Sequence, residues 1–424
     1  MSKIVKKSFL EEAHQGYDAR RASEEAARCL LCHDAPCSAG CPAKTDPARF
    51  IRSLHFGNIK GAAETVRENN ILGGCCANLC PYDRMCEEAC SRSGIDVPIQ
   101  IGRLQRYIVE QEQALGMNIL RAPEGGKKRG KVACVGAGPA SLACAAKLAQ
   151  QGCEVTIYEA LPKPGGVLSY GIIPARLPQR VVDFDIQQVK NLGVKFVFGA
   201  KVDNLDKLRA EYDAVFIGVG LWTSKMPEIP GIELEGVVSA IRFLKEARQS
   251  GKKPGENLLV IGGGDVAMDC ASAASQLGAD KVTIVYRRSI EEAPAGMAEL
   301  GYIQQQGIPM ICEMAPAEVL GEGGRVVGMR FESRDGYSQL RLKADKVIFA
   351  IGQALDAPDG IALSENGLIG TECEGDCGCA TGLAGVFAAG DAVNGGKTVV
   401  EAVAQGKEAA SCILAYLEEK AGAK

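Results

Sequence analysis

Cysteine is the residue type whose number and spacing in this chain point most directly to chemistry. The sequence has 18 cysteines in 424 residues, and nine of them lie between Cys29 and Cys90. Thiolates this closely spaced are typical ligands of zinc ions and of iron–sulfur clusters. The chain is too large for a small disulfide-stabilised secreted domain, so metal binding or redox use is the better interpretation. The two runs are Cys29-x2-Cys32-x4-Cys37-x3-Cys41 and Cys76-x3-Cys80-x5-Cys86-x3-Cys90, with Cys75 directly before the second.

The cysteines outside these runs show no ligand spacing. Cys373, Cys377 and Cys379 lie in a glycine-rich stretch, where we expect surface thiols of a loop. The others are expected to pack in the core, since free cysteine behaves as a small apolar residue. They are Cys134, Cys144, Cys153, Cys270, Cys312 and Cys412.

A glycine-rich turn between a predicted strand and a predicted helix is the second chemical signature. In the segment Val135-Gly136-Ala137-Gly138-Pro139-Ala140-Ser141, Gly136 permits a tight turn and Gly138 lets the backbone approach a pyrophosphate. Glu159 ends the next predicted strand, 23 residues after Gly136. An acid there accepts a hydrogen bond from a ribose 2′-hydroxyl. A glycine-rich turn without a ligand is the alternative, but strand, helix, second strand and acid together favour dinucleotide binding.

The same unit occurs a second time. It reads Val260-Ile261-Gly262-Gly263-Gly264-Asp265-Val266-Ala267, and its second strand, Val282–Tyr286, is followed by Arg287 and Arg288 instead of an acid. Arginine at this place can pair with a 2′-phosphate, which favours NADP over NAD. The alternative is that both arginines are ordinary solvated charges.

Strands and helices must alternate along the chain to place these two units. Buried strands are predicted at Lys131–Val135 and Val155–Tyr158. The same order of strand, glycine turn, helix and strand is predicted again at Leu258–Arg288. Such alternation predicts an α/β fold with parallel, doubly wound sheets. Residues 1–120 show helix-like stretches and no strand pattern. The predicted domains are a helical domain at 1–120, a first dinucleotide-binding domain at 121–245 and 356–424, and a second one inserted at 246–355.

The dinucleotide-binding part resembles the flavoprotein reductases that carry two such domains, FAD in the first and a nicotinamide nucleotide in the second. Residues 131–424 carry this resemblance, and Val386-Phe387-Ala388-Ala389-Gly390-Asp391 is similar to the second FAD stretch of that family. In the family this aspartate contacts the ribityl chain. The helix that begins near Thr398 would then direct its N-terminus at the flavin. A redox flavoprotein needs an electron outlet, which favours iron–sulfur clusters over zinc.

The cysteine runs resemble the N-terminal domain of dihydropyrimidine dehydrogenases and of glutamate synthase small subunits, so the resemblance covers essentially the whole chain. It implies two [4Fe–4S] clusters, with Cys76 as a non-ligand. At the position of Gln105, glutamate synthase small subunits typically carry glutamate, which favours the dihydropyrimidine dehydrogenase branch. The alternative is that Gln105 is a helix-surface residue. The implied ligands are Cys29, Cys32, Cys37 and Cys90 for one cluster, and Cys41, Cys80, Cys86 and Gln105 for the other.

The same resemblance implies the residues that bind FAD and NADH or NADPH. They are Gly136, Gly138, Pro139, Ala140, Glu159, Val167, Arg176, Val202, Gly262, Gly264, Asp265, Val266, Ala267, Arg287, Arg288, Gly352, Gly390, Asp391, Thr398 and Val399. Histidine is absent beyond His55, so it is not expected to serve as acid, base or ligand in these domains.

The function implied is that of an electron-input subunit. It would oxidise NADH or NADPH through FAD and pass electrons through two clusters to an FMN-containing catalytic subunit that interconverts uracil or thymine and 5,6-dihydropyrimidines. We expect the pyrimidine site on that partner, because this sequence offers no FMN barrel. A glutamate synthase small subunit, or a related NAD(P)H:acceptor reductase, is the runner-up. A dithiol enzyme like thioredoxin reductase is disfavoured, since the dinucleotide domains contain no CxxC-type pair.

Composition sets limits on partners and location. The net charge of −4 gives no electrostatic reason to expect nucleic acid. No apolar stretch approaches the roughly 18 residues of a membrane-spanning helix. Residues 1–10 are lysine-rich and lack the apolar core of a signal peptide. We therefore expect a cytoplasmic protein without membrane or nucleic-acid partners.

Overall fold

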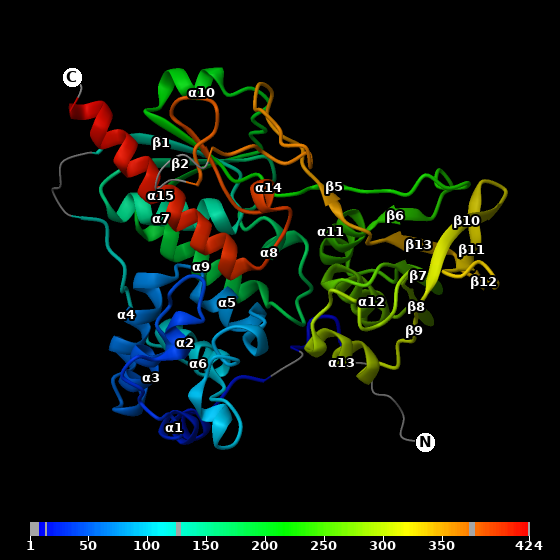
Figure 1. Ribbon diagram of the computed structural model, residues 1–424, viewed down its shortest axis with the longest axis horizontal. Coiled ribbons are helices and arrows are strands. Elements are labelled where there is room, and N and C mark those ends of the chain that lie inside the picture. The colour runs from blue at the N-terminus through cyan, green and yellow to red at the C-terminus, as the bar shows by residue number, and fades with distance from the viewer. Residues whose placement is uncertain (1–7, 13–14, 124–128, 373–377, 423–424) are drawn as a thin grey trace. The chain divides into compact units, whose positions relative to one another are not determined.

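The computed structural model describes residues 8–12, 15–123, 129–372 and 378–422 (Figure 1). Cys373, Cys377 and most of the N-terminal segment 1–10 lie outside the described residues. The chain divides into two compact units. The inserted unit comprises Met1–Ala13, Tyr170–Pro178 and Trp222–Ala354, and the outer unit comprises His14–Ser169, Gln179–Leu221 and Leu355–Lys424.

The cysteine-rich part of the outer unit is helical, as predicted. Short polar side chains begin several of its helices: Asp18 accepts a hydrogen bond from the Arg21 N–H at 2.8 Å, and Asn58 accepts one from Gly61 at 2.8 Å. Phe50 and Leu104 are fully buried between the helices. The elements are α1 (Ala19–Ala27), α2 (Pro36–Ala39), α3 (Pro47–His55), α4 (Ile59–Asn69), α5 (Gly73–Leu79), the 3₁₀ turns η1 (Tyr82–Arg84) and η2 (Ser91–Gly94), and α6 (Ile101–Ala114).

The outer unit also contains a five-stranded parallel sheet in the order β15-β4-β1-β2-β3. Its central strands are apolar runs buried on both faces, as parallel sheets covered by helices require. The strands are β1 (Lys131–Val135), β2 (Glu154–Glu159), β3 (Lys195–Phe198), β4 (Ala214–Ile217) and β15 (Val386–Ala388). The helices are α7 (Pro139–Gln150), α8 (Val167–Tyr170), α9 (Gln179–Asn191), α10 (Asp206–Glu211), α14 (Asp391–Asn394) and α15 (Val399–Gly422).

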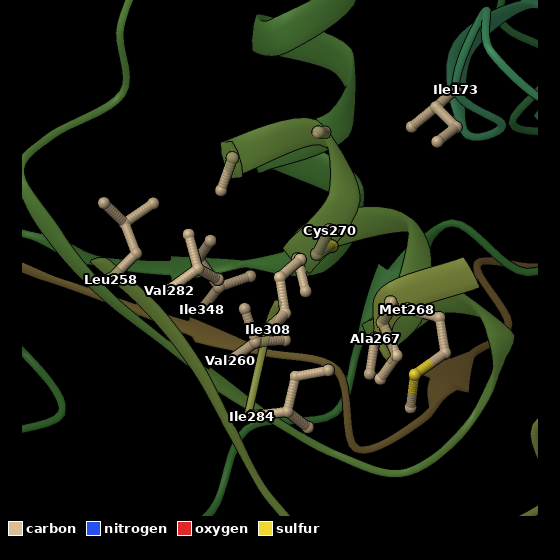
Figure 2. Close-up of a cluster of buried hydrophobic side chains, with 14 of the residues drawn as sticks. Ile173, Leu258, Val260, Ala267, Met268, Cys270, Val282, Ile284, Ile308 and Ile348 are labelled. Carbon is tan, nitrogen blue, oxygen red and sulfur yellow. The ribbon is translucent and has the colours of Figure 1, made fainter. Parts of the chain in front are cut away.

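The inserted unit repeats this plan with a second parallel sheet, β6-β13-β7-β8-β9. Figure 2 shows its core, where Val260, Ile284 and Ile348 of the strands lie beside Met268 and Cys270 of α12. The strands are β6 (Val237–Ser239), β7 (Asn257–Ile261), β8 (Lys281–Val285), β9 (Met310–Ile311) and β13 (Lys346–Phe349). The helices are α11 (Ala240–Ser250), α12 (Asp265–Gln276) and α13 (Met297–Gln305).

Two smaller sheets complete the inserted unit. An antiparallel sheet of β10 (Met314–Glu322), β11 (Arg325–Ser333) and β12 (Gln339–Lys343) was not foreseen from the sequence. The short strands β5 (Thr223–Ser224) and β14 (Gln353–Ala354) pair where the chain enters and leaves the unit. None of the described helices is long and apolar enough to cross a membrane.

The predicted insertion of one dinucleotide fold in the other is confirmed by strand order. β15 pairs with β4 in the first sheet, although the whole second sheet lies between them in sequence. The inserted unit also includes two segments that we assigned to the first domain, 170–178 and 222–245, so its predicted start at residue 246 is wrong. In Tyr170–Pro178, the side chains of Ile173, Ala175 and Leu177 are buried, and the first two belong to the core of the inserted unit (Figure 2).

Candidate cofactor and cluster sites

The four predicted ligands of the first cluster converge on one small pocket. Its floor includes Ile51 of α3 and Ile101 of α6, and four thiols line it: Cys29, Cys32, Cys37 and Cys90. All four are partly exposed. Burial, followed by the nearby Cys90, raises the pKa of Cys37 to about 11. This thiol is therefore protonated at neutral pH and would release its proton on binding iron. We call these four cysteines the first thiol group.

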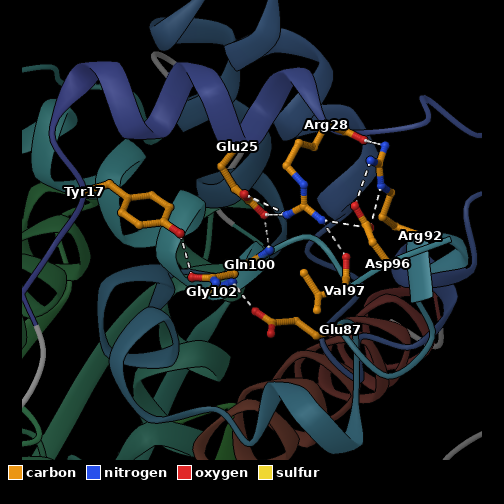
Figure 3. A network of polar contacts seen from close by, with 9 residues as sticks. All are labelled: Tyr17, Glu25, Arg28, Glu87, Arg92, Asp96, Val97, Gln100 and Gly102. Atoms are coloured by element: carbon orange, nitrogen blue, oxygen red, sulfur yellow. Dashed lines mark hydrogen bonds and ion pairs between the residues drawn. The ribbon is translucent and has the colours of Figure 1, made fainter. Parts of the chain in front are cut away.

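Two arginines hold the loops of the first thiol group together (Figure 3). Arg28, at the end of α1, donates to Asp96 at 3.1 Å and to the Val97 carbonyl at 2.7 Å. Arg92 donates to Asp96 at 2.8 Å and to the Arg28 carbonyl at 2.8 Å. These bonds tie the segment after Cys90 to the end of the helix before Cys29. Ligands 61 positions apart in sequence are thereby held together by protein contacts alone.

A second thiol group forms beside α5. A hydrogen bond with Cys76, followed by burial, raises the pKa of Cys80, and Cys41 and Cys86 lie close enough to raise it further. Cys41, Cys76 and Cys86 are buried. The structure therefore brings together the three predicted cysteine ligands of the second cluster. It also places Cys76, a predicted non-ligand, directly beside Cys80.

Gln105 of α6 is 7% exposed, so the alternative that it is a helix-surface residue is wrong. Its Nε2 donates to the Gly73 carbonyl at 2.7 Å, which fixes the side chain against the first residue of α5. Because the amide nitrogen has this partner, the carbonyl oxygen is the atom left to coordinate iron. Its role as a ligand stays a prediction.

A single metal ion and a [4Fe–4S] cluster require different spacings of four thiols. Among the described residues, no three His, Cys, Asp or Glu side chains converge closely enough to hold one metal ion. Four thiolates on a tetrahedral zinc, with Zn–S of about 2.3 Å, would have sulfur atoms about 3.8 Å apart. A [4Fe–4S] cluster binds each thiolate through a different iron, so its ligands stand farther apart.

The first glycine turn has the backbone that dinucleotide binding requires. Gly136 follows β1 with φ +88°, and a Cβ there would lie 2.7 Å from the Gly218 carbonyl oxygen. Gly138 precedes α7, whose N-terminus has no side-chain cap, and Pro139 and Ala140 form its first turn. An uncapped helix N-terminus beside glycine backbone is a site for a pyrophosphate.

Glu159 closes this site from the end of β2. The side chain is buried, and burial raises the pKa of its carboxyl group. Oε2 accepts from the Ala137 N–H at 2.7 Å, and Oε1 accepts from the Leu161 N–H at 2.8 Å. The carboxylate therefore fixes the glycine turn to the end of β2, in addition to its predicted contact with a ribose.

The C-terminal FAD residues reach the same edge of the sheet. A Cβ on Gly390, which follows β15, would lie 2.9 Å from the Ala140 Cβ, so this turn packs on the first turn of α7. Asp391 is the next residue. Thr398 begins α15 with a reciprocal cap: its N–H and hydroxyl donate to Glu401 at 3.0 and 2.7 Å, and its hydroxyl accepts from the Glu401 N–H at 3.4 Å. Val399 is the first residue of α15.

Two further predicted FAD residues follow strands or loops of this unit. Val167 begins α8, directly after Gly166, whose added Cβ would lie 2.9 Å from the Gly138 Cα. Val202 follows β3 and packs against the core that includes Leu205. Both therefore lie in the outer unit with the glycine turn.

The second glycine turn is built like the first. A Cβ on Gly262 would lie 2.3 Å from the Ala350 carbonyl oxygen, and Gly264 precedes α12, which also lacks a side-chain cap. Asp265 begins α12, and its Oδ1 accepts from the Gly296 N–H at 3.1 Å. Val266 and the fully buried Ala267 complete the first turn.

The remaining predicted nucleotide residues lie at the carboxyl ends of neighbouring strands. Arg287 and Arg288 follow β8 and are exposed, which fits a 2′-phosphate site and solvated charges equally. Gly352 follows β13 with φ +123°, and its carbonyl accepts from the Lys225 N–H at 3.0 Å. β7, β8 and β13 are parallel neighbours, so these residues share one edge with Gly262.

Arg176, predicted to bind one of the two dinucleotides, pairs with two acids in the structure. It belongs to the inserted unit, where its guanidinium bonds to Asp269 of α12 at 2.9 Å and Glu299 of α13 at 2.7 Å. Burial raises the pKa of Asp269 to about 6, against the lowering effect of Arg176. Arg176 thus pairs two acids of the inserted unit, and its role in cofactor binding stays a prediction.

Sequence reasoning missed a buried clamp that joins α4, α6 and α9 beside the second thiol group. Arg67 of α4 donates to Glu112 at 2.8 Å and to Asp185 of α9 at 2.7 Å, and all three side chains are fully buried. Asp185 also accepts from the N–H groups of Gly74 at 3.3 Å and Cys75 at 2.8 Å. The clamp therefore holds the N-terminus of α5, the helix that carries Cys76.

Other cysteines were also misjudged. Cys379 is 4% exposed, so the prediction of a surface thiol is wrong for this residue. Cys412 is disulfide-bonded and is more than a packing residue. Cys134 and Cys144 are buried as predicted, and their thiols hydrogen-bond to each other. Their separation in sequence, on β1 and α7, concealed this pairing.

Both parts of the chain match known protein families. Residues 5–117 match the family described as dihydropyrimidine dehydrogenase domain II, 4Fe-4S cluster, and residues 130–406 match the pyridine nucleotide-disulphide oxidoreductases. The chain is 44% identical over 422 residues to the NAD-dependent dihydropyrimidine dehydrogenase subunit PreT of Escherichia coli K12, covering 98% of this chain and 99% of that one. It is 31% identical to the glutamate synthase [NADPH] small chain of Halomonas elongata, covering 96% of this chain and 93% of that one.

Solved structures show the same fold for the dinucleotide-binding part. FprA of Mycobacterium tuberculosis in complex with NADPH matches with TM-score 0.60 and 19% identity, over 69% of this chain and 86% of that one. Thioredoxin reductase of T. acidophilum matches with TM-score 0.56 and 21% identity, over 68% and 98%. The predicted fold class, enzyme class and cofactors (FAD, iron–sulfur clusters and NAD(P)H) are confirmed. The chain belongs to the family of NAD(P)-dependent iron–sulfur flavoprotein oxidoreductases that includes the dihydropyrimidine dehydrogenase subunit PreT and the glutamate synthase small chain.

Proposed function

We propose that this chain is the electron-input subunit of a dihydropyrimidine dehydrogenase. It oxidises NAD(P)H through FAD and passes electrons through two [4Fe–4S] clusters to an FMN-containing subunit that interconverts uracil or thymine and their 5,6-dihydro forms. One observation carries the proposal: two separate thiol groups, each supplying at least three buried or half-buried cysteines, lie in the same unit as the first dinucleotide fold.

The residues of this chain bind and orient, and they need not transfer protons to or from a substrate. Bound FAD accepts hydride from a nicotinamide and releases electrons one at a time. The glycine turns at Gly136 and Gly262 let the backbone approach the two pyrophosphates. The N-terminus of α15 contributes positive potential where a reduced flavin gains negative charge. The absence of histidine beyond His55 is therefore no obstacle to this function.

The first thiol group suits the exit of electrons to the partner. Its cysteines are partly exposed, whereas Cys41, Cys76 and Cys86 of the second group are buried. Apolar side chains close to the first group are also exposed: Leu30 to 44%, Ile95 to 65% and Val97 to 58%. We infer that the FMN-containing subunit docks here, because single-electron transfer requires a short distance between donor and acceptor.

The division of labour between the two subunits can be tested directly. The purified chain should reduce a tetrazolium dye with NAD(P)H, and uracil or thymine turnover should appear only after the partner is added. Uracil reduction by the single chain would overturn the assignment of the pyrimidine site to a partner. The names of the relatives support a subunit role, since PreT is named as a dehydrogenase subunit.

A glutamate synthase small subunit is the second candidate, supported by 31% identity over nearly the full chain. The buried Gln105, where we expect glutamate in that branch, argues against it. Glutamate formation from glutamine with a large amidotransferase partner would favour this candidate.

The nucleotide preference follows from Arg287 and Arg288 if they bind a 2′-phosphate. The double change Arg287→Ala with Arg288→Ala should then raise KM for NADPH much more than KM for NADH. Equal effects would show that neither arginine contacts the 2′-phosphate, in agreement with the NAD dependence in the name of PreT. We further propose a cytoplasmic location, where the free cysteines of the two thiol groups stay reduced and available to bind iron.

A further inference from the structure

Lys407 of α15 connects the FAD-type fold to the second thiol group. Its Nζ donates to the Ala43 carbonyl at 2.8 Å and to the Asn69 carbonyl at 2.7 Å, 364 and 338 residues away in sequence. Asn69 is the last residue of α4, so the ammonium caps the negative end of that helix. Ala43 lies two residues after Cys41.

The turn that Lys407 holds is wrapped around the Cys41 sulfur. The Lys44 N–H donates to the Cys41 carbonyl at 2.9 Å, and the Thr45 N–H donates to the Cys41 Sγ at 3.4 Å. Ala43 is at the apex of this turn. Fixing its carbonyl therefore fixes the direction of the Cys41 thiol.

The residue before Lys407 contacts the first dinucleotide fold. A Cβ on Gly406 would lie 2.2 Å from the Ala140 carbonyl oxygen, so α15 is pressed against the first turn of α7 at this point. α15 also contacts α5, which carries Cys76. Lys407 thus lies between the predicted pyrophosphate site and a predicted cluster ligand. With a rise of 1.5 Å per residue, it is about 13 Å along α15 from Thr398.

The charge of Lys407 acts directly at this site. Lys407 is partly buried, and burial, followed by the nearby Lys147, lowers the pKa of its ammonium group, whereas the nearby Cys41 acts in the opposite direction. A [4Fe–4S] cluster becomes more negative when reduced, and its potential depends on nearby charge, hydrogen bonds and exposure. A fixed ammonium beside a ligand therefore stabilises the reduced cluster relative to the oxidised one.

We propose that Lys407 is the positioning residue that orients Cys41 and raises the reduction potential of the cluster that Cys41 ligates, which makes that cluster the better acceptor of flavin electrons. The inference rests on the proposed function, since it requires a cluster at the second thiol group.

The test is an EPR-monitored redox titration of the anaerobically purified full chain. The signal of the second cluster is identified as the one that Cys41→Ser alters. Lys407→Gln retains a donor for the two carbonyls and removes the charge. It should lower the ratio of reduced to oxidised second cluster about tenfold at a fixed potential, which corresponds to about 59 mV for one electron. Lys407→Arg should retain the wild-type potential, and the first cluster should be unchanged in both variants.

Lys420→Met is the matched control. Lys420 lies on the same helix and donates to a backbone carbonyl, that of Asp213, at 3.3 Å. Loss of the Lys420 charge should leave the reduction potentials of both clusters unchanged. A wild-type potential in Lys407→Gln, or an equal shift in both clusters, would overturn the proposal for Lys407 alone. A wild-type chain without two iron–sulfur signals would instead refute the proposed function.

Discussion

The two thiol groups use the same residue type in opposite surroundings. The first is carried by loops at the surface, and exposed pairs such as Arg92–Asp96 hold those loops together. The second has three buried cysteines and the half-buried Cys80, and it is held by Gln105, Lys407 and the fully buried clamp of Arg67. A site that exchanges electrons with a partner must be accessible, whereas a site fed from within the chain must be fixed relative to its donor. The contrast therefore gives each group a different role.

The largest expected effect comes from breaking the buried clamp. Arg67→Met leaves the carboxylates of Glu112 and Asp185 buried without their cation, which should cost about 3–5 kcal/mol of stability. The second iron–sulfur signal should be lost before the first, because the clamp holds α5. Denaturant unfolding under anaerobic conditions, followed by EPR, measures both effects.

An exposed arginine of the same region provides the control for the clamp. Arg49 pairs with Glu68 at 3.2 Å, and the two side chains are 58% and 51% exposed. Arg49→Met should cost no more than about 1 kcal/mol. Equal losses of unfolding free energy in the two variants would show that the buried clamp contributes no more to stability than an exposed ion pair.

The second group can be examined further through its fourth ligand. Gln105→Cys should change the EPR signal of the second cluster and leave the first signal intact. Cys76→Ser should change neither signal, although Cys76 lies beside Cys80. Loss of the second signal in Cys76→Ser, with no effect of Gln105→Cys, would exchange the roles of these two residues.

The smallest expected effect concerns the surface around the first group. Leu30→Glu with Val97→Glu should slow electron transfer to the FMN-containing partner about tenfold, equivalent to about 1.4 kcal/mol. Dye reduction by the single chain should be unaffected. Leu115→Glu, a change at an apolar residue that is 63% exposed at the end of α6, is the matched control. If it slows partner reduction equally, the docking surface does not lie at the first thiol group.

What could be predicted from the sequence was local. Gly136, Glu159 and the cysteine spacings lie within short segments. The residue types of these segments alone indicate their backbone conformation and their chemistry. The parallel sheets followed in the same way from alternating strands and helices. The structure brings the predicted cysteine ligands into two groups and places both glycine turns before helix N-termini, whereas Arg176 pairs with Asp269 and Glu299.

What could not be predicted depends on contacts between distant segments. Arg67 and Asp185 are 118 residues apart, and Lys407 reaches a carbonyl 364 residues away. Neither Lys407 nor Arg67 belongs to a motif, and a charged residue on a helix is normally solvated. The segment Tyr170–Pro178 belongs to the inserted unit because Ile173 and Ala175 are buried in the core of that unit. No local pattern in the sequence specifies which of two similar cores accepts such a segment.

The proposal that two iron–sulfur clusters receive electrons through FAD is tested most directly by metal analysis and EPR of the anaerobically purified chain. We expect one FAD, about eight irons and two distinct cluster signals after reduction with NAD(P)H, since each [4Fe–4S] cluster uses four ligands. Stoichiometric zinc with little iron, or a bound flavin that NAD(P)H reduces without any cluster signal, would contradict it.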